Sequence, residues 1–278
     1  MTSTLHLVRL PVSLSALALY ADDRGWTRRR ASDGRDRDAS FDADRALHHV
    51  LDETFGPSML KPFRLMVPRD RDKGTVYAYS AQTKAELLQI AADTGMPEAQ
   101  RIFDLDRLEE RAMPTAWTVG KRLAFDVHIR PTVRIKSPLP NPRQGKQPYA
   151  AGAELDAFLV EAGRQQPDAA PRFVDGRRAP SGITAAGRDR EAVYRDWLAA
   201  RLQPAAELNP SRTSMTGYQR ERLARAGAAL DGPAATFHGE LTITDPAAFK
   251  TLLARGVGRH RSFGFGMLLL RPARPEDR

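Results

Sequence analysis

Histidine is the residue type in this sequence that is best suited to moving protons, and the chain has six histidines. An imidazole can take up or release a proton near neutral pH because its unperturbed pKa is about 6.5. The chain has no cysteine, which excludes disulfides, zinc–thiolate sites and iron–sulfur clusters. It has no His-x-x-x-His helix and no nucleophile elbow. These residue types therefore favour proton transfer by histidine, and no motif indicates a metal or a cofactor.

Two of the histidines, His48 and His49, are adjacent in the segment 42–56, which we predict to be a helix. An aspartate can cap its start, a Gly-Pro pair ends it, and apolar residues recur on one face. The two histidines lie on opposite flanks of that face, so periodicity alone does not choose between them. Asp44 and Asp52 lie one turn to either side of His48 and would favour its imidazolium. Two ordinary surface histidines would give the same pattern.

The segment 256–270, GVGRHRSFGFGMLLL, is the clearest local feature of the chain. Glycine adopts positive φ and allows close backbone approach, and amides beside arginines can bind phosphate. The segment is not a dinucleotide fingerprint, because Arg261 stands where that motif needs glycine and because the turn leads from a helix into a strand. A purely structural turn is the alternative. The expected phosphate contacts here are Gly256, Gly258, Arg259, His260, Arg261, Ser262 and Gly264.

The charge of the chain favours a polyanionic partner. Lysine and arginine total 43 against 34 acidic residues, a net charge of +9. Arginine suits phosphate because its planar fork donates paired hydrogen bonds and stacks on bases. A genome rich in G and C would also enrich arginine, and solvated surface arginines would look the same. Candidate nucleic-acid contacts outside the glycine-rich turn are Arg28, Arg29, Arg143, Lys146, Arg212 and Arg220.

The elements that must position these residues form two halves. In the first half we predict strands over 3–11, 63–68, 75–80 and 104–114, and helices over 13–23, 42–56 and 82–95. The order is strand, helix, strand, strand, helix, strand, which is the pattern of a ferredoxin-like domain and also of RNA-recognition modules. Since one fold serves many functions, this order alone does not establish one.

The second half has similar parts. We predict strands over 121–136, 235–244 and 262–272, helices over 153–166, 189–202 and 245–256, and a hairpin within 207–226. We place the domain boundary near Thr118, so the expected domains are 1–117 and 118–278. No apolar run is long enough to cross a bilayer, and the first 23 residues indicate a strand and a helix rather than a signal peptide. We expect a cytoplasmic protein.

Three segments carry a family resemblance. FHGELTITDPAAFKTLLARGVGRHRSFGFGMLLL, over 237–270, resembles the C-terminus of the CasE family, the CRISPR-RNA-processing endoribonucleases of type I-E CRISPR systems. TVGKRLAFDVHIRPTVR, over 118–134, resembles the central strand of the family, and REAVYRDWLAARL, over 190–202, resembles a second-half helix. The resemblance is spread over most of the chain.

The resemblance implies an α+β protein of two tandem ferredoxin-like domains that binds the stem-loop of a CRISPR repeat. It implies cleavage on the 3′ side of the hairpin without a metal. The 2′-hydroxyl would attack the scissile phosphate, leaving a 2′,3′-cyclic phosphate and a 5′-hydroxyl. The enzyme would stay on its product and join the other subunits of the Cascade complex, with no membrane contact.

The resemblance also selects a histidine. The family helix carries a Leu-His pair followed by a leucine and an aromatic residue, and Leu47-His48, Leu51 and Phe55 reproduce that spacing. A tyrosine often found three residues before the histidine is replaced here by Arg45, which would instead stabilise charge on the phosphorane. This departure keeps open a non-catalytic RNA-binding subunit that caps the hairpin. The third alternative is an unrelated ferredoxin-like protein that binds another polyanion.

Overall fold

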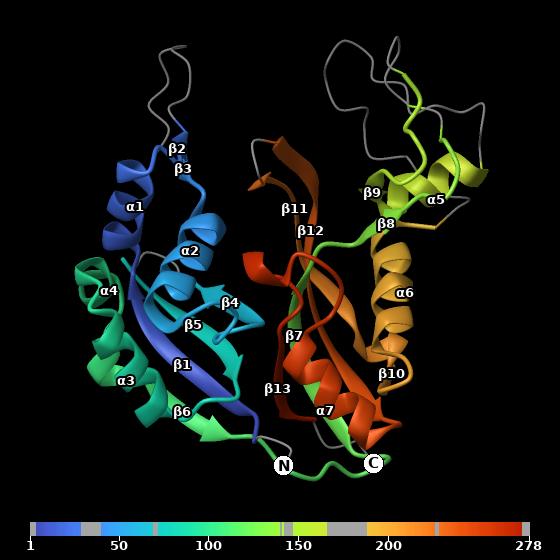
Figure 1. Ribbon diagram of the computed structural model, residues 1–278. Coiled ribbons are helices and arrows are strands. Elements are labelled where there is room, and N and C mark those ends of the chain that lie inside the picture. The colour runs from blue at the N-terminus through green and yellow to red at the C-terminus, as the bar shows by residue number, and fades with distance from the viewer. Residues whose placement is uncertain are drawn as a thin grey trace.

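The structure is a computed structural model that describes residues 4–28, 40–68, 72–139, 141, 147–165, 188–225 and 228–273. Within these ranges the chain forms two α+β domains that lie side by side (Figure 1). Both have the ferredoxin-like fold, which confirms the predicted fold class. In the described part of the chain, no helix is both long and apolar enough to span a membrane.

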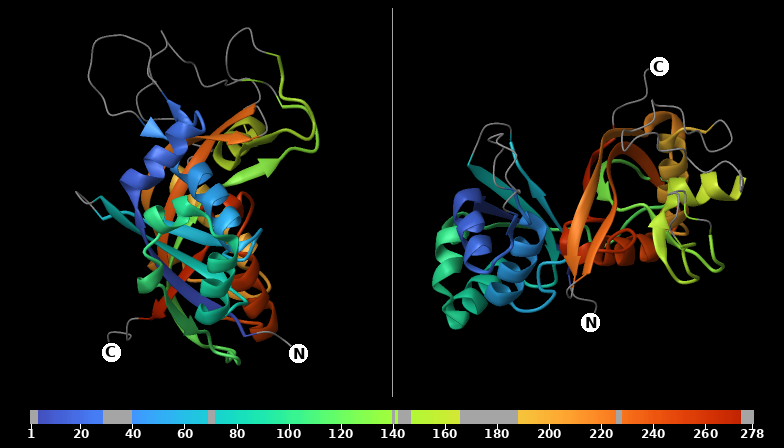
Figure 2. Two further views of the ribbon diagram at one scale, coloured as in Figure 1. Left: turned by 60° about the vertical axis from the view of Figure 1, so that its left-hand side comes forward. Right: turned by 90° about the horizontal axis from the view of Figure 1, so that it is seen from above.

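The first domain is a four-stranded antiparallel sheet in the order β4-β5-β1-β6. Its helices cover the outer face of the sheet, away from the second domain (Figure 2). A separate two-stranded ribbon, β2 with β3, precedes α2. The elements are β1 (His6–Ser13), α1 (Leu14–Asp23), β2 (Thr27–Arg28), β3 (Ser40–Phe41), α2 (Ala43–Phe55), β4 (Phe63–Met66), β5 (Lys73–Ser80), α3 (Lys84–Thr94), α4 (Pro97–Ile102), the 3₁₀ helix η1 (Leu105–Arg107) and β6 (Glu109–Ala112).

The position of α2 follows from local sequence. Of the two aspartates that could cap its start, Asp42 and Asp44, it is Asp42 that accepts a hydrogen bond from the backbone N–H of Arg45, and the helix ends at Gly56, as predicted. Its apolar face packs into one buried cluster with the alternate apolar residues of β1. Since that face is buried against the sheet, the flanks of α2 that carry His48 and His49 remain partly exposed.

The second domain has a five-stranded sheet in the order β10-β12-β7-β13, with β11 paired to β12. Strands β11 and β12 form a long hairpin that rises between the two domains in the view of Figure 1. The elements are β7 (Arg122–Ile129), β8 (Thr132–Arg134), β9 (Glu154–Asp156), α5 (Ala157–Gln165), α6 (Arg190–Leu202), β10 (Ala206–Leu208), the 3₁₀ helix η2 (Pro210–Arg212), β11 (Ser214–Arg225), β12 (Ala228–Ile243), α7 (Pro246–Arg255), the 3₁₀ helix η3 (Arg261–Phe263) and β13 (Leu268–Pro272).

Two predicted elements divide differently in the structure. The expected strand over 121–136 is two strands, because Pro131 has no N–H for the ladder and interrupts it between β7 and β8. The expected helix over 153–166 begins instead with strand β9, which pairs with β8. The break and the new strand together form a small separate sheet beside the main one. This small sheet carries residues of the site described below.

Three further boundaries were wrong. The hairpin expected within 207–226 is formed by β11 with the longer β12, while β10 pairs with the far end of β12. The strand expected over 262–272 begins only at Leu268, because the glycines before it adopt positive φ. The strand expected over 104–114 begins at Glu109, and α4 and η1 precede it.

The domains contact each other through the inner face of the first sheet. The buried Tyr79 hydroxyl donates a hydrogen bond to the backbone oxygen of Leu268, 2.9 Å away. Arg64 forms an ion pair with Asp126 across the same interface. Residues 113–121 connect the last strand of the first sheet to β7. We propose the domain boundary near Thr118, within this connection.

Candidate functional site

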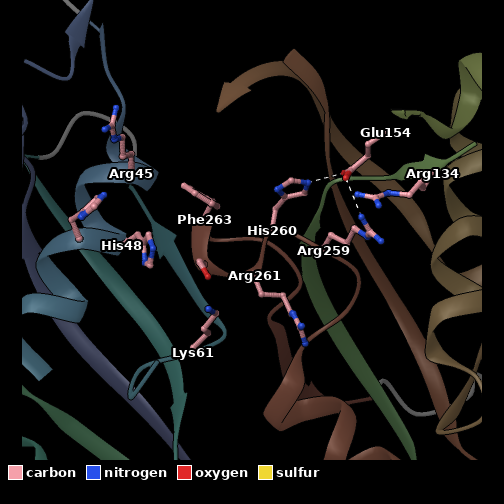
Figure 3. A pocket seen from close by; sticks show the side chains of 11 residues that line it. Arg45, His48, Lys61, Arg134, Glu154, Arg259, His260, Arg261 and Phe263 are labelled. Atoms are coloured by element: carbon pink, nitrogen blue, oxygen red, sulfur yellow. Dashed lines mark hydrogen bonds and ion pairs between the residues drawn. The ribbon is translucent and has the colours of Figure 1, made fainter. Parts of the chain in front are cut away.

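A cavity of about 570 Å³ lies between α2 of the first domain and the glycine-rich turn of the second. Figure 3 shows side chains from both domains pointing into it. Five of the lining residues are lysine or arginine and three are histidine, against a single carboxylate. Such a surface attracts a polyanion. The lining residues are Arg45, His48, His49, Lys61, Arg134, Glu154, Arg259, His260, Arg261, Ser262 and Phe263.

His48 faces the glycine-rich turn. Its ring meets the Phe263 ring edge-on at 5.4 Å between centroids, and its Nδ1 lies 3.5 Å from a carboxylate oxygen of Asp52. Burial lowers the pKa of His48, and the proton is further disfavoured by His49 and Lys61, while Asp52 opposes the shift. The expected stabilisation of the imidazolium was therefore wrong, since burial outweighs the one carboxylate in reach. At neutral pH the ring is uncharged and can accept a proton.

His49 lines the same cavity from the neighbouring flank of the helix. Its ring packs against Trp26 at 4.7 Å between centroids, and the rings of His48 and His49 are 5.4 Å apart. The Arg45 guanidinium also lies over Trp26, 4.4 Å from the ring centroid. Trp26 therefore contacts both Arg45 and His49, while His48 is the histidine of this pair whose ring meets the turn, at Phe263.

Asp44 is not a partner of His48. A Cβ built on Gly264 would lie 3.2 Å from Asp44 Oδ1, so this carboxyl packs against the turn instead. Burial together with the nearby carboxylates of Glu221 and Asp42 raises the pKa of Asp44 to about 8. Asp44 is therefore mostly protonated at neutral pH. No local pattern predicted its contact with the turn.

The glycines of the turn serve its packing. Gly258 and Gly264 have φ of 75° and 76°, and a Cβ at Gly258 would lie 2.7 Å from the Trp197 ring. Among the described residues that line the cavity, none is glycine, so Gly256, Gly258 and Gly264 support the turn from behind. The residues from Arg259 to Phe263 line the cavity in front of this support.

Glu154 of β9 is the carboxylate of the cavity. Its Oε1 lies 2.7 Å from His260 Nε2 and accepts a hydrogen bond from Thr132 Oγ1 at 2.6 Å. Its Oε2 lies 3.3 Å from Arg259 Nη1. The hydrogen bond from His260 lowers the pKa of Glu154 to about 2, against its burial. Arg261 donates to the backbone oxygen of Arg255 at 2.5 Å.

The remaining predicted contacts lie elsewhere. Arg212 pairs with Glu240 at 3.2 Å and Arg220 with Asp231 at 3.4 Å, and neither lines the cavity. Arg28 lies in β2, which places its backbone near the Trp26 end of the site. Arg29, Arg143 and Lys146 lie outside the described residues. Four further residues line the cavity and were not predicted from the sequence: Lys61, Arg134, Glu154 and Phe263.

The other three histidines have partners away from the cavity. His6 lies 2.8 Å from Glu110, His128 bonds Thr236 at 2.9 Å and stacks on Phe265, and His238 pairs with Asp126. In the described ranges, no group of three or more His, Cys, Asp or Glu side chains could hold a metal ion.

Comparisons with known proteins identify related chains. A family model described as CRISPR associated protein matches residues 14–272. The fold resembles Cse3 of Thermus thermophilus "bound to an RNA representing a pre-cleavage complex", with 16% identity and a TM-score of 0.56 over 97% of this chain and 100% of that one. It also resembles the "CRISPR endoribonuclease Cse3 bound to 19 nt RNA", with 16% identity and a TM-score of 0.57 over 97% and 100%.

A third similar structure is the CRISPR-associated protein Cas6e of Escherichia coli str. K-12, with 17% identity and a TM-score of 0.54 over 96% of this chain and 100% of that one. At such identities the likeness shows a shared fold and no more. A search among curated proteins gave no match.

Proposed function

The chain belongs to the CRISPR associated protein family, and we propose that it is a metal-independent endoribonuclease that binds the stem-loop of a CRISPR repeat. It cuts precursor CRISPR RNA on the 3′ side of that hairpin. The observation that carries this proposal is the cavity between the domains, where an uncharged imidazole stands among cationic side chains. The similar Cse3 structures are described as endoribonuclease and as RNA-bound, which supports the same assignment.

The proposed chemistry is proton transfer by His48. Its neutral ring accepts the proton of the 2′-hydroxyl as the 2′-oxygen bonds to phosphorus. The bond from phosphorus to the 5′-oxygen then breaks, and this oxygen takes up a proton from water or from the imidazolium. The products are a 2′,3′-cyclic phosphate and a 5′-hydroxyl. The lowered pKa of His48 suits the role of base, because the acceptor form predominates at neutral pH.

The cationic residues of the cavity provide the charge that phosphoryl transfer needs. Arg45, held over Trp26, stabilises the extra negative charge on the phosphorane. Lys61 lies close enough to His48 to disfavour the imidazolium form, and it lines the same cavity, so it binds the phosphate there. Arg259 and Arg261 hold the adjoining phosphates. We further propose that the enzyme retains its product and joins a Cascade complex in the cytoplasm.

Cleavage of labelled repeat RNA in the presence of a chelator tests the proposal. We expect a single cut, a 2′,3′-cyclic phosphate on the upstream fragment and a 5′-hydroxyl on the downstream one. RNA with a 2′-deoxy nucleotide at the cut is the control, and it should bind but stay intact because the attacking group is gone. Loss of cleavage in chelator would refute the metal-free mechanism.

A second candidate function is a non-catalytic subunit that caps the CRISPR RNA hairpin. The observation that favours it is Arg45, which stands where the family often has a tyrosine and is engaged with Trp26. The same experiment separates the two, since a capping subunit binds repeat RNA tightly and never cuts it.

A further inference from the structure

Glu154 is a carboxylate in a cavity that we propose binds RNA. It is the single acidic residue among the described side chains that line the cavity, and its pKa of about 2 keeps it ionised at every pH at which RNA is handled. An ionised carboxylate repels phosphate, so simple electrostatics predicts that Glu154 weakens RNA binding. The contacts of Glu154 indicate the opposite role.

Both oxygens of Glu154 are occupied by groups from other segments. Oε1 accepts hydrogen bonds from Thr132 on β8 and from His260 Nε2–H, at 2.6 and 2.7 Å, and Oε2 pairs with Arg259 at 3.3 Å. The donor on His260 must be Nε2–H, because an ionised carboxylate only accepts. Glu154 therefore ties the glycine-rich turn to the β8–β9 sheet (Figure 3).

The backbone at His260 explains why such a tie is needed. His260 has φ of 60° and ψ of 28°, the left-handed conformation that a residue with a Cβ disfavours. It directly precedes η3, from which Arg261, Ser262 and Phe263 enter the cavity. A side-chain bond to a fixed carboxylate offsets this strain and holds the start of η3 in place.

The burial of His260 determines whether its side chain can contact RNA. Its side chain is only 5% exposed, so the imidazole is not free to contact RNA. By contrast, the side chain of Arg259 is 55% exposed although one guanidinium nitrogen pairs with Glu154. The imidazole therefore serves as the attachment point of the turn, and the neighbouring arginines are what the turn presents.

We propose that Glu154 is a positioning residue, which acts through His260 and Arg259 to hold the glycine-rich turn in the conformation that binds RNA phosphates. This inference rests on the proposed function. It reverses the electrostatic expectation, because removal of a negative charge from the cavity should weaken RNA binding. If loss of the tie leaves about one tenth of the molecules with a competent turn, the apparent Kd rises about tenfold.

The test compares Glu154→Ala, Glu154→Gln and the control Glu109→Gln in binding to 2′-deoxy repeat RNA, which cannot be cut. Glu109 also pairs with one arginine, Arg9 at 2.8 Å, but it lies on β6 away from the cavity. We expect Glu154→Ala to bind about tenfold more weakly. Glu154→Gln, which keeps a carbonyl acceptor for His260, should recover part of the loss. Glu109→Gln should match the wild type.

A double-mutant cycle and a spectrum separate positioning from general damage. If Glu154 acts through His260, the affinity losses of Glu154→Ala and His260→Ala should not add. The ¹⁵N spectrum of histidine-labelled, RNA-free protein should show one hydrogen-bonded Nε2–H that moves in Glu154→Gln. Circular dichroism and thermal melting verify that each variant is folded.

The outcomes are distinct. Equal or tighter RNA binding by folded Glu154→Ala and Glu154→Gln overturns the inference and leaves the electrostatic account. Fully additive losses in the cycle also overturn it, since Glu154 would then not act through His260. A wild-type protein that does not bind repeat RNA overturns the proposed function itself.

Discussion

Replacement of His48 by alanine separates chemistry from binding. General acid–base catalysis contributes about 10²–10⁴-fold, so His48→Ala should cut at least about 100-fold more slowly, a loss of about 2.7 kcal/mol of transition-state stabilisation. The uncharged ring of His48 in the wild type can offer RNA only one ordinary hydrogen bond, worth about 1 kcal/mol. The Kd of His48→Ala for RNA should therefore rise by about fivefold at most. The gap between the two numbers makes the variant informative.

The assay is single-turnover cleavage of labelled repeat RNA with enzyme in excess, beside a binding titration with 2′-deoxy RNA. His49→Ala is the matched control, because His49 is adjacent and lines the same cavity but packs against Trp26. It should cut at close to the wild-type rate. If His49→Ala is inactive and His48→Ala cuts normally, the assignment within the histidine pair is reversed.

The pH profile tests the role of base. Burial places the pKa of His48 below 6.5, and the neutral ring is the acceptor. The cleavage rate should therefore rise as pH increases through that lowered pKa and level off by neutral pH. A rate that falls as pH rises through the same range would mean that the imidazolium is needed, and His48 would then be the acid. Normal cleavage by both histidine variants would refute the catalytic assignment altogether.

Three further predictions follow from the turn. Replacing Arg259 and Arg261 together with alanine should flatten the plot of log affinity against log salt by about one unit per lost phosphate contact, and an unchanged slope would show that they face away from RNA. Gly264→Ala should lower the unfolding free energy in urea by more than Gly25→Ala. Both glycines have positive φ, but only at Gly264 would the added Cβ meet a neighbour, Asp44 Oδ1 at 3.2 Å. Equal losses of unfolding free energy would contradict this packing. The pKa of Asp44 is raised to about 8 in the folded protein, so its ionisation lowers the stability of the wild type as pH rises from about 4 to 8. Asp44→Asn should therefore have a higher Tm than the wild type at pH 8 but not at pH 4. A difference in Tm that is the same at both pH values would refute the shift.

Local sequence was enough for the elements that carry the site. An aspartate at its start, the apolar face of α2 and the glycine at its end predicted the histidine helix with its observed bounds to within a residue. The order of strands and helices predicted two ferredoxin-like domains, because alternating and helical periods are visible in neighbouring residues. The glycine-rich turn was recognisable because few residues other than glycine adopt positive φ repeatedly.

Errors arose where a long-range contact decides the outcome. The segment over 121–136 divides at Pro131, and the part that follows, β8, pairs with β9 rather than with the main sheet. Likewise, Asp44 is one helical turn from His48 in sequence but packs against Gly264 of the other domain. Periodicity describes one element, and it is silent about which neighbour each side chain meets.

Local patterns were enough to predict the fold class, the helix with its two histidines and the cationic turn. The packing of the domains brought these parts to one cavity and joined Glu154 to His260 across 106 residues. It also added Lys61, which precedes β4, and Arg134 of β8. It also decided the charge of His48, because a pKa depends on burial and on every charge nearby in space. Such distances between segments are set by the packing of two domains, which no local pattern encodes.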